Sequence, residues 1–168
     1  EDRRVFSKMV FPGLPSSPAL DIVKLGDEGG RRVVVHSRLT DSGGRAYTFS
    51  ETLDPADIGQ IYRLFFKENY PKVISEKDRH YVVKDAEERV VGGLCYHVMY
   101  HNVVFIDAVV VTSPLKNRGI GRAMLDDFCG RMASHNVTIV LTHFFLPGFF
   151  LKAGFKRDKR WGALVKYL

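Results

Sequence analysis

The spacing of apolar residues predicts a helix near the middle of the chain. From residue 54 to residue 69 apolar side chains recur every three or four positions, as expected for a helix with one buried face. Asp54 followed by Pro55 is typical of a helix start, because the aspartate caps free amides and proline suits the first helical position. We expect the helix to end near Asn69, before Pro71. Its predicted buried face consists of Ile58, Ile61, Tyr62, Phe65 and Phe66.

Apolar runs and turn residues predict a sheet around this helix. Residues 31–38 and 45–53 favour strands and flank the turn at 41–44, whose glycines suit a hairpin. A stripe made of Ile120, Met124, Phe128 and Met132 predicts a second helix. The later elements are expected in this order: strands at 79–84, 89–99 and 103–111, a helix at 119–135, a strand at 137–141, a short helix at 147–152 and a strand at 161–168. This order predicts an α/β fold with a mixed, mostly antiparallel sheet and helices on both faces.

The length and composition fit one domain. We expect a single domain over residues 1–168, with an N-terminal arm and hairpin at 1–50 and a core at 51–168. A proline-rich stretch at 11–18 cannot form a regular helix and predicts a surface arm. The apolar runs are too short to cross a bilayer, so we expect no membrane partner. The chain shows no targeting signal, and we leave open that it is part of a larger protein.

Cysteine usage and charge narrow the environment and the ligand. Cys95 and Cys129 lie in apolar segments without a paired cysteine, which predicts buried free thiols and a cytoplasmic protein. The net charge of +6 favours an anionic ligand. Basic runs at 31–32 and 156–160 lack interleaved aromatic residues, so we interpret them as solvated surface and not as a nucleic-acid site.

A glycine turn between a strand and a helix predicts a phosphate site. The apolar strand at 103–111 leads through a short loop to Gly119 and Gly121, which open the second helix. The first amides of a helix have no partner within it, and together with the helix dipole they bind phosphate oxygens. Met124 stands where a dinucleotide fingerprint needs its third glycine, and Gly121 is not followed by the lysine of a P-loop. Both of these nucleotide sites are therefore excluded.

Three segments carry a resemblance to a known family. The sequence RGIGRA at 118–123, directly after an apolar strand, resembles the coenzyme signature of the GNAT N-acetyltransferases. The sequence FFLKAGF at 149–155 resembles the second signature of the family, and VVGGLCY at 90–96 is similar to its central strand, particularly in the histone-acetylating branch. The resemblance covers residues 54–168 and implies the GNAT fold and an N-acetyltransferase that uses acetyl-CoA as co-substrate.

The resemblance also implies which residues bind the coenzyme. Backbone groups of Val109 and Val111 would pair with the pantetheine arm, and amides of residues 118–123 would hold the pyrophosphate. Three positions depart from the family pattern. Lys116 replaces glutamine or arginine, the usual asparagine after the following strand is not evident near Thr142 and His143, and Phe150 replaces the tyrosine that protonates the leaving thiolate. The implied coenzyme-binding residues are Val109, Val111, Lys116, Asn117, Arg118, Gly119, Ile120, Gly121, Arg122, Ala123 and Phe150.

Asp107 is the candidate general base. Amide formation from a thioester needs a neutral amine, so a base must remove a proton from the acceptor's ammonium. Asp107 is the one acid in its apolar strand and, by strand alternation, should share a face with Val109. Polyamine acetyltransferases look similar at this position, whereas the histone-acetylating branch has its glutamate at the position of Phe105. In the alternative interpretation, Asp107 only pairs with a neighbouring group.

Other chemistries find less support in the sequence. Tyr96, Tyr100 and His143 are possible proton donors in place of Phe150, although each also suits a packing role. His97 and His101 straddle a strand end without a third ligand close in sequence, so we expect no metal. No serine or cysteine lies in a nucleophile elbow, which argues against an acyl-enzyme.

Two functions remain. The first is acetyl transfer from acetyl-CoA to a primary amine of a protein lysine or a small molecule, by direct attack with general-base assistance. The alternative is an inactive acyl-CoA-sensing module of a larger protein. We expect the acceptor to enter beside the helix that begins at Pro55 and the loop at 68–71. The sequence leaves the acceptor, the acyl length and the oligomeric state open.

Overall fold

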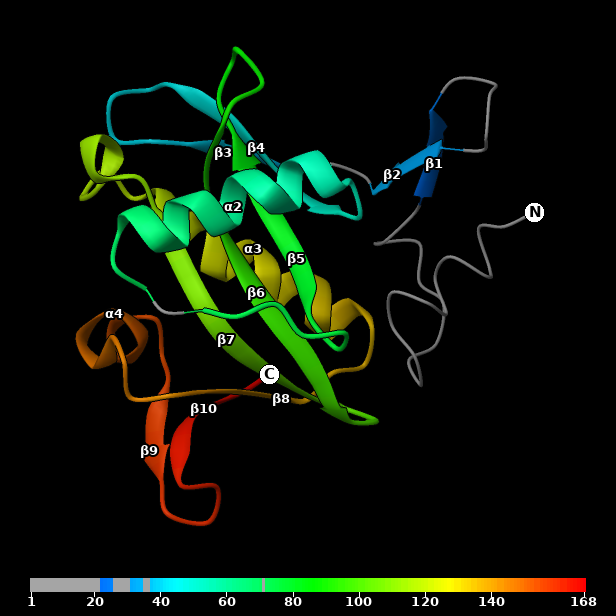
Figure 1. Ribbon diagram of the computed structural model, residues 1–168. Helices are drawn as coiled ribbons and strands as arrows, with labels where there is room; N and C mark the ends of the chain where they lie inside the picture. Colours follow the sequence, from blue (N-terminus) through cyan, green and yellow to red (C-terminus); the bar gives the residue numbers. More distant parts are fainter. Residues whose placement is uncertain (1–21, 26–30, 35–36, 71) are drawn as a thin grey trace.

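A mixed eight-stranded sheet forms the centre of the protein. A computed structural model describes residues 22–25, 31–34, 37–70 and 72–168. The strand order is β3-β4-β5-β6-β7-β8-β10-β9, and all neighbours are antiparallel except β7 and β8, which run parallel (Figure 1). The strands are β3 (Ser37–Thr40), β4 (Ala46–Thr52), β5 (Arg79–Lys84), β6 (Val90–Tyr100), β7 (Val103–Val111), β8 (Ile139–Thr142), β9 (Lys156–Asp158) and β10 (Ala163–Tyr167). The predicted α/β class with a mostly antiparallel sheet is confirmed.

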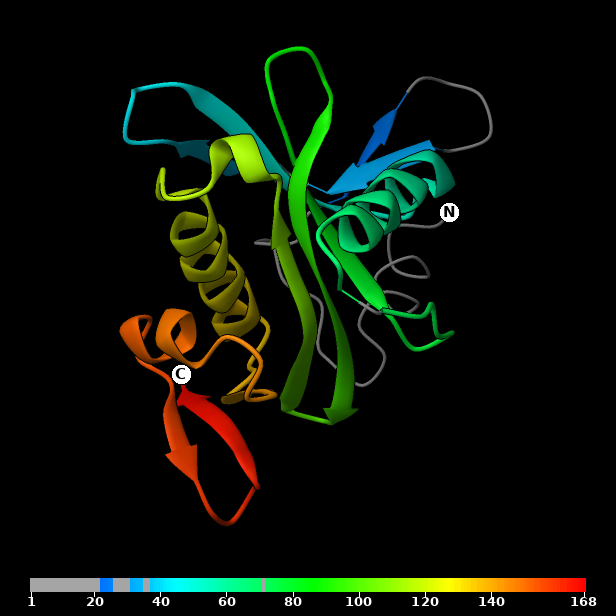
Figure 2. The same cartoon turned by 60° about the vertical axis from the view of Figure 1, so that its left-hand side comes forward.

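Helices cover both faces of the sheet, as Figures 1 and 2 show from two sides. Helix α2 (Pro55–Lys67) lies on one face, where Ile61 and Phe65 pack with residues of β5, β6 and β7. Helix α3 (Ile120–Ser134) lies on the other face and contributes its predicted stripe to the larger core cluster. Gly93 permits the close approach of α2, because a Cβ atom there would collide with Ile61 Cδ1. The shorter helices are the 3-10 helix η2 (Ser113–Leu115) and α4 (Pro147–Lys152).

Most predicted elements are confirmed, with three corrections. Phe66 was expected in the core, but its side chain is 85% exposed at the solvent side of α2. The strand expected at 31–38 is divided: β2 (Arg31–Val34) pairs with β1 (Ile22–Leu25) in a separate two-stranded sheet, and only β3 joins the central sheet. Strands β1 and β9 were not expected, and the basic residues of β9 carry no apolar pattern. The proline-rich stretch at 11–18 and Pro71 lie outside the described residues.

A β-bulge in β7 changes which side chains face each helix. Cys95 pairs with Ala108 and Tyr96 pairs with Ile106, so Asp107 is an extra residue without a partner in β6. Ile106, before the bulge, packs in the core cluster on the side of α3. After the bulge, Ala108 packs in the cluster on the side of α2, and Val109 again packs on the side of α3. One extra residue therefore breaks the alternation of faces along the strand.

The two cysteines are buried, as their apolar segments predicted. Cys95 and Cys129 are buried and form no disulfide. Burial raises the pKa of Cys129 to about 11 and also raises that of Cys95, so both stay protonated at neutral pH. Among the described residues, no helix has the length and apolar character needed to span a membrane.

Candidate active site

The predicted phosphate turn leaves three amides free at the start of α3. Asn117 and Gly119 have positive φ angles of 65° and 84°, which turn the chain sharply into the helix. The amides of Ile120, Gly121 and Arg122 have no acceptor among the described residues. The amide of Ala123, in contrast, donates to the Gly119 carbonyl at 3.0 Å. The expectation that Ala123 offers its amide to a phosphate is therefore corrected, because that amide belongs to the first helical hydrogen bond.

The β3–β4 hairpin holds this turn in place. The Ser42 amide donates to the Arg118 carbonyl at 2.9 Å, and Asp41 Oδ2 lies 3.8 Å from Arg118 Nη1. Asp41 also accepts hydrogen bonds from the amides of Gly43 and Arg45 and from the Tyr47 hydroxyl. Burial alone would raise the pKa of Asp41, but these hydrogen bonds lower it overall. A segment outside the expected core thus positions the phosphate turn.

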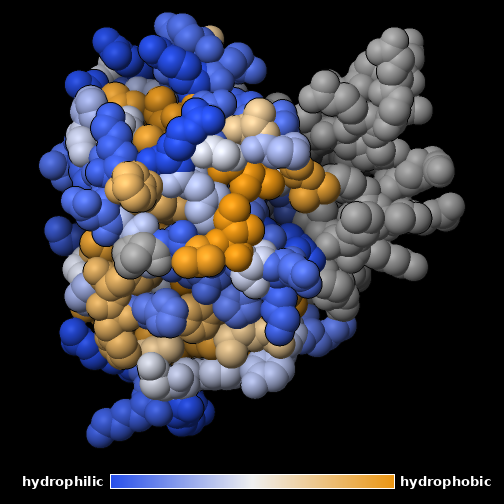
Figure 3. Space-filling view, in the orientation of Figure 1, coloured by the Kyte–Doolittle hydropathy of each residue, from blue (hydrophilic) through white to orange (hydrophobic). Residues whose placement is uncertain are grey.

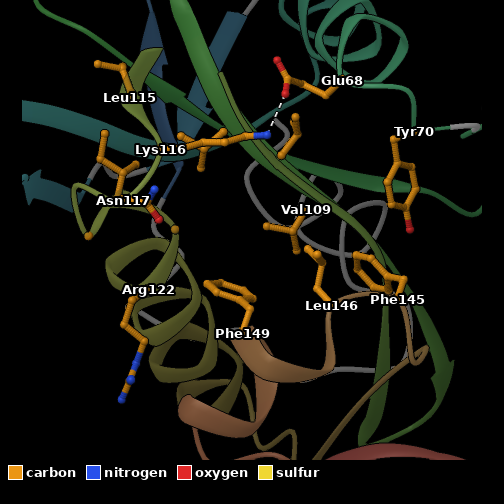
Figure 4. A pocket seen from close by; sticks show the side chains of 15 residues that line it. Glu68, Tyr70, Val109, Leu115, Lys116, Asn117, Arg122, Phe145, Leu146 and Phe149 are labelled. Atoms are coloured by element: carbon orange, nitrogen blue, oxygen red, sulfur yellow. Dashed lines mark hydrogen bonds and ion pairs between the residues drawn. The ribbon is translucent and has the colours of Figure 1, made fainter. Parts of the chain in front are cut away.

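A cavity of about 550 Å³ opens beside the turn, between the C-terminal end of α2, β7 and the start of α3 (Figure 4). Eight of the predicted coenzyme-binding residues line it: Val109, Val111, Lys116, Asn117, Gly119, Ile120, Gly121 and Arg122. The other lining residues are Glu68 and Tyr70, from the loop beside which we expected the acceptor, and five that had no predicted binding role: Val110, Leu115, Phe145, Leu146 and Phe149. The cavity therefore joins the phosphate turn to an apolar channel along β7.

Three of the predicted coenzyme-binding residues do not line the cavity. The side chain of Arg118 points towards Asp41, and Ala123 packs against the core. Phe150 is fully buried, within 5.1 Å of Phe155 between ring centroids. The aromatic side chain at the cavity wall is Phe149, whose Cε1 would lie 3.3 Å from a Cβ atom on Gly121. In α4, the structure thus turns Phe149 and not Phe150 towards the site.

The sheet opens next to the cavity. Parallel pairing between β7 and β8 covers four residue pairs and ends at Ile106 and Thr142. The Thr142 hydroxyl donates to the Ile106 carbonyl at 2.9 Å and closes this paired region. Strand β7 continues to Val111, and beyond Ile106 no described strand pairs with its backbone on the β8 side. That open edge is where an extended pantetheine arm could pair with Val109 and Val111.

Asp107 lies where the two strands separate. Its Oδ2 atom is 2.7 Å from His97 Nδ1, and its side chain is 16% exposed. Because of the bulge, Asp107 shares the α2-side face with His97, while Val109 packs on the other face. The expectation that Asp107 and Val109 share a face is therefore wrong. The new position places the carboxylate on the side where we expect the acceptor.

Tyr70 connects Asp107 to the cavity. Its hydroxyl donates to the Asp107 carbonyl at 2.7 Å, and its ring lines the cavity 5.3 Å from that of Phe145 (Figure 4). Burial, followed by the nearby Asp107 charge, raises the pKa of Tyr70 to about 12. Tyr70 follows α2 in a loop, and no local pattern connects it with β7. Only the folded structure reveals its contact with the site.

The proton donors considered from the sequence lie in other places. Tyr96 is fully buried in the core beside Tyr81 and Phe128. Tyr100 is 60% exposed at the far end of β6, and His143 is exposed with its ring against Phe105. None of the three lines the cavity.

A second group of polar side chains adjoins Asp107. Ligand atoms of Asp78, His97 and Asp107 lie within 4.8 Å of one another, as do those of Asp78, His80 and Cys95. The ammonium group of Lys72 lies 2.9 Å from Asp78 Oδ2, so a divalent ion there would meet a positive charge. Burial lowers the pKa of His80 to about 4, which keeps that ring neutral. The absence of a bound metal stays a prediction.

Glu68 and Lys116 face each other across the cavity. Lys116 Nζ lies 2.7 Å from Glu68 Oε1, and the Ser113 hydroxyl donates to the same carboxylate at 2.8 Å (Figure 4). The hydrogen bond from Lys116, followed by that from Ser113, lowers the pKa of Glu68. A carboxylate is unexpected at the edge of an anion site, and here it forms an ion pair with Lys116.

Comparisons with known proteins agree with this arrangement. The family described as Acetyltransferase (GNAT) family matches residues 46–155. A GNAT acetyltransferase from Staphylococcus aureus Mu50 superposes with a TM-score of 0.59 at 14% identity, covering 73% of this chain and 99% of the other. Tetrahymena GCN5 gives a TM-score of 0.60 at 19% identity, with 79% and 95% covered. The GNAT domain of S. lividans PAT gives 0.64 at 13% identity, with 79% and 97% covered. A search of curated protein sequences gives no match.

The fold and the family match define an acyl-CoA-dependent N-acyltransferase. Since the family match spans more than half of the sequence, the chain belongs to the acetyltransferase (GNAT) family. Acetyl-CoA is the co-substrate of this family. The free amides of α3 and the open edge of β7 fit the two parts of that molecule, its pyrophosphate and its pantetheine arm.

Proposed function

We propose that this protein transfers an acetyl group from acetyl-CoA to a primary amine, with Asp107 as the general base. The observation that carries the proposal is the position of Asp107, at the point where β7 and β8 separate. The open edge beyond this point would hold the pantetheine arm, so the thioester would lie beside the carboxylate. A base must lie within hydrogen-bonding reach of the attacking amine, directly or through one water.

The proposed reaction uses these positions as follows. Asp107 accepts a proton from the acceptor's ammonium, and the neutral amine attacks the thioester carbonyl carbon. A C–N bond forms, the C–S bond breaks, and the coenzyme leaves as a thiolate. His97, 2.7 Å from the carboxylate, holds Asp107 in place and offers a second proton acceptor. Because Asp107 lies on the α2-side face, we expect the acceptor to approach from that side of the strand.

Tyr70 is our candidate for the proton donor to the leaving thiolate. Phe150 has no acidic proton, whereas the Tyr70 hydroxyl lies at the cavity. Its raised pKa of about 12 keeps the hydroxyl protonated at neutral pH, as a general acid requires. The hydrogen bond to the Asp107 carbonyl holds the hydroxyl beside the position that we propose for the thioester.

A protein lysine is our preferred acceptor over a small polar amine. The segment between α2 and β5 carries Val73 and Ile74, which are 80% and 62% exposed. Figure 3 shows apolar surface in the middle of the face that α2 and this segment cover. Apolar surface beside an acceptor site suits the side chains that flank a lysine in a polypeptide. This preference and a cytoplasmic location remain proposals.

The proposal is tested by incubating the protein with acetyl-CoA and a panel of acceptors, while the release of free thiol is followed. The panel contains lysine peptides with apolar or acidic flanks, spermidine and an aminoglycoside. We expect thiol release with lysine peptides, and most with apolar flanks. Tight binding of CoA without thiol release for any acceptor would refute the proposal and favour the sensing module.

A further inference from the structure

A lysine of the protein itself lies at the proposed acceptor site. Lys72 belongs to the segment that joins α2 to β5 and crosses in front of β7 and β6 in Figure 1. Two contacts show that this segment lies against β7: the hydrogen bond from Tyr70 to the Asp107 carbonyl, and the short distance between Asp78 and Asp107. The side chain of Lys72 is only 14% exposed. The ammonium group therefore points inwards.

One carboxylate contacts this ammonium group, and a second lies close to the first. Its Nζ atom lies 2.9 Å from Asp78 Oδ2, and an Asp78 oxygen lies within 4.8 Å of an Asp107 oxygen and of a His97 ring nitrogen. The nearby charge of Asp107 also acts on Lys72. The site proposed to receive a substrate's ammonium thus already contains an ammonium on a flexible alkyl chain. Elsewhere in the described segments, other groups bind the ammonium groups of Lys84, Lys116 and Lys166.

We propose that Lys72 is a site of self-acetylation, in which its own amine serves as the acceptor. This inference rests on the proposed function. Asp107 takes a proton from the Lys72 ammonium, and the freed amine attacks the carbonyl carbon of acetyl-CoA. A C–N bond forms, the C–S bond breaks, and the thiolate takes a proton as CoA leaves. The product is Nε-acetyl-Lys72, which has lost its positive charge.

The surroundings of Lys72 require a base of this kind. Burial alone would lower the pKa of Lys72, but the hydrogen bond to Asp78 and the neighbouring charges raise it overall. The amine is therefore protonated at neutral pH and does not react without assistance. A lysine on the surface without such a base reacts with the coenzyme only by slow chemical acetylation. Dependence on the base therefore distinguishes enzymatic self-acetylation from the chemical reaction.

Lys77 is the matched control. It lies in the same segment, five positions further along, but its side chain is exposed. Chemical acetylation should therefore label Lys77 at least as fast as Lys72. If the enzyme itself acetylates Lys72, Lys72 is labelled faster than Lys77, because the fold holds its amine beside the base.

The test uses the full chain, acetyl-CoA and site-resolved mass spectrometry over time. We expect Lys72 to be acetylated about tenfold faster than Lys77 or more, at a rate independent of protein concentration. Asp107→Asn should abolish the labelling of Lys72 and leave that of Lys77 unchanged, whereas Lys77→Arg should leave Lys72 labelling intact. Equal labelling of both lysines, or labelling of Lys72 that survives in Asp107→Asn, overturns the inference.

The same reactions separate this inference from the proposed function. Each incubation is repeated with the best peptide acceptor. If the peptide is acetylated while Lys72 stays unmodified, self-acetylation is refuted and the proposed function stands. If neither the peptide nor Lys72 is acetylated although CoA binds, both proposals fail.

Discussion

Replacing Gly121 by valine tests the phosphate site most directly. A Cβ atom on Gly121 would lie 3.3 Å from Phe149 Cε1 and 3.7 Å from Val111 Cγ2, inside the cavity. The valine methyl groups would extend further and cover the free amides at the start of α3. A phosphate could then no longer approach those amides closely.

The structure allows the loss of affinity to be estimated. If valine blocks two of the three free amides, two hydrogen bonds to a charged group are lost, each of about 1.5 kcal/mol at the lower end of the usual range. The total of about 3 kcal/mol corresponds to a rise in Kd of roughly 100-fold. The fold should tolerate the change, because the helix propensity of valine is roughly a few tenths of a kcal/mol better than that of glycine.

Calorimetry with CoA and a thermal melt measure the two effects separately. We expect a Kd about 100-fold higher with an almost unchanged melting temperature. Gly130→Val is the matched control, since Gly130 lies in the same helix and a Cβ atom there would have no neighbour within 4 Å. An unchanged Kd in Gly121→Val, or an equal loss in Gly130→Val, would show that the amides of α3 do not bind the coenzyme.

Four further predictions concern the neighbouring groups. Asp107→Asn should lower kcat/KM by about 100-fold or more without changing the Kd of CoA, as steady-state kinetics and calorimetry can check; a wild-type rate would make Asp107 structural. Tyr70→Phe should lower kcat about 100-fold with CoA affinity retained, and an unchanged kcat would assign the proton donor elsewhere. The pKa of Asp41 is lower in the folded protein than in the unfolded chain. Its carboxylate therefore stabilises the fold at pH values above its pKa in the unfolded chain, and this stabilisation is lost as the pH falls through its pKa in the folded protein. In urea melts between neutral and acidic pH, the free energy of unfolding of Asp41→Asn should therefore fall less than that of the wild type. An equal fall in both proteins would contradict this. Glu68→Gln removes a negative charge beside the anion site and frees Lys116, so CoA should bind more tightly, most clearly at low ionic strength; weaker binding would mean that Glu68 supports the cavity.

The sequence was informative wherever a local pattern determines the structure. Asp54 caps α2 by accepting from the Ala56 amide at 2.9 Å, and the helix begins at Pro55 as predicted. The stripe of α3 and the strand bounds 79–84 and 103–111 also follow from apolar spacing alone. Phe66 shows the limit of this reasoning, because the spacing cannot tell how wide the buried face of a helix is.

The site needed information that is distant in sequence. Tyr70 and Glu68 reach the cavity because the loop after α2 lies against β7 and η2, and their contacts span 37 and 45 residues. The regular alternation of side chains along a strand predicted the wrong face for Asp107. The bulge that changes its face depends on how β7 pairs with β6, which the local sequence does not show. In α4, a rotation of one residue decides that Phe149 and not Phe150 meets the cavity, and the signature alone does not determine this rotation.

The bulge at Asp107 makes the length of β7 as important as its composition. A substitution at this position removes a carboxylate but keeps the residue count, so Ile106 and Val109 stay on the same side of the sheet. A deletion would restore regular alternation and force one half of the strand to exchange its faces. An alignment with a relative whose matching strand lacks this bulge therefore needs a one-residue gap at Asp107. Without such a gap, residues that face α2 in one protein would be matched with residues that face α3 in another.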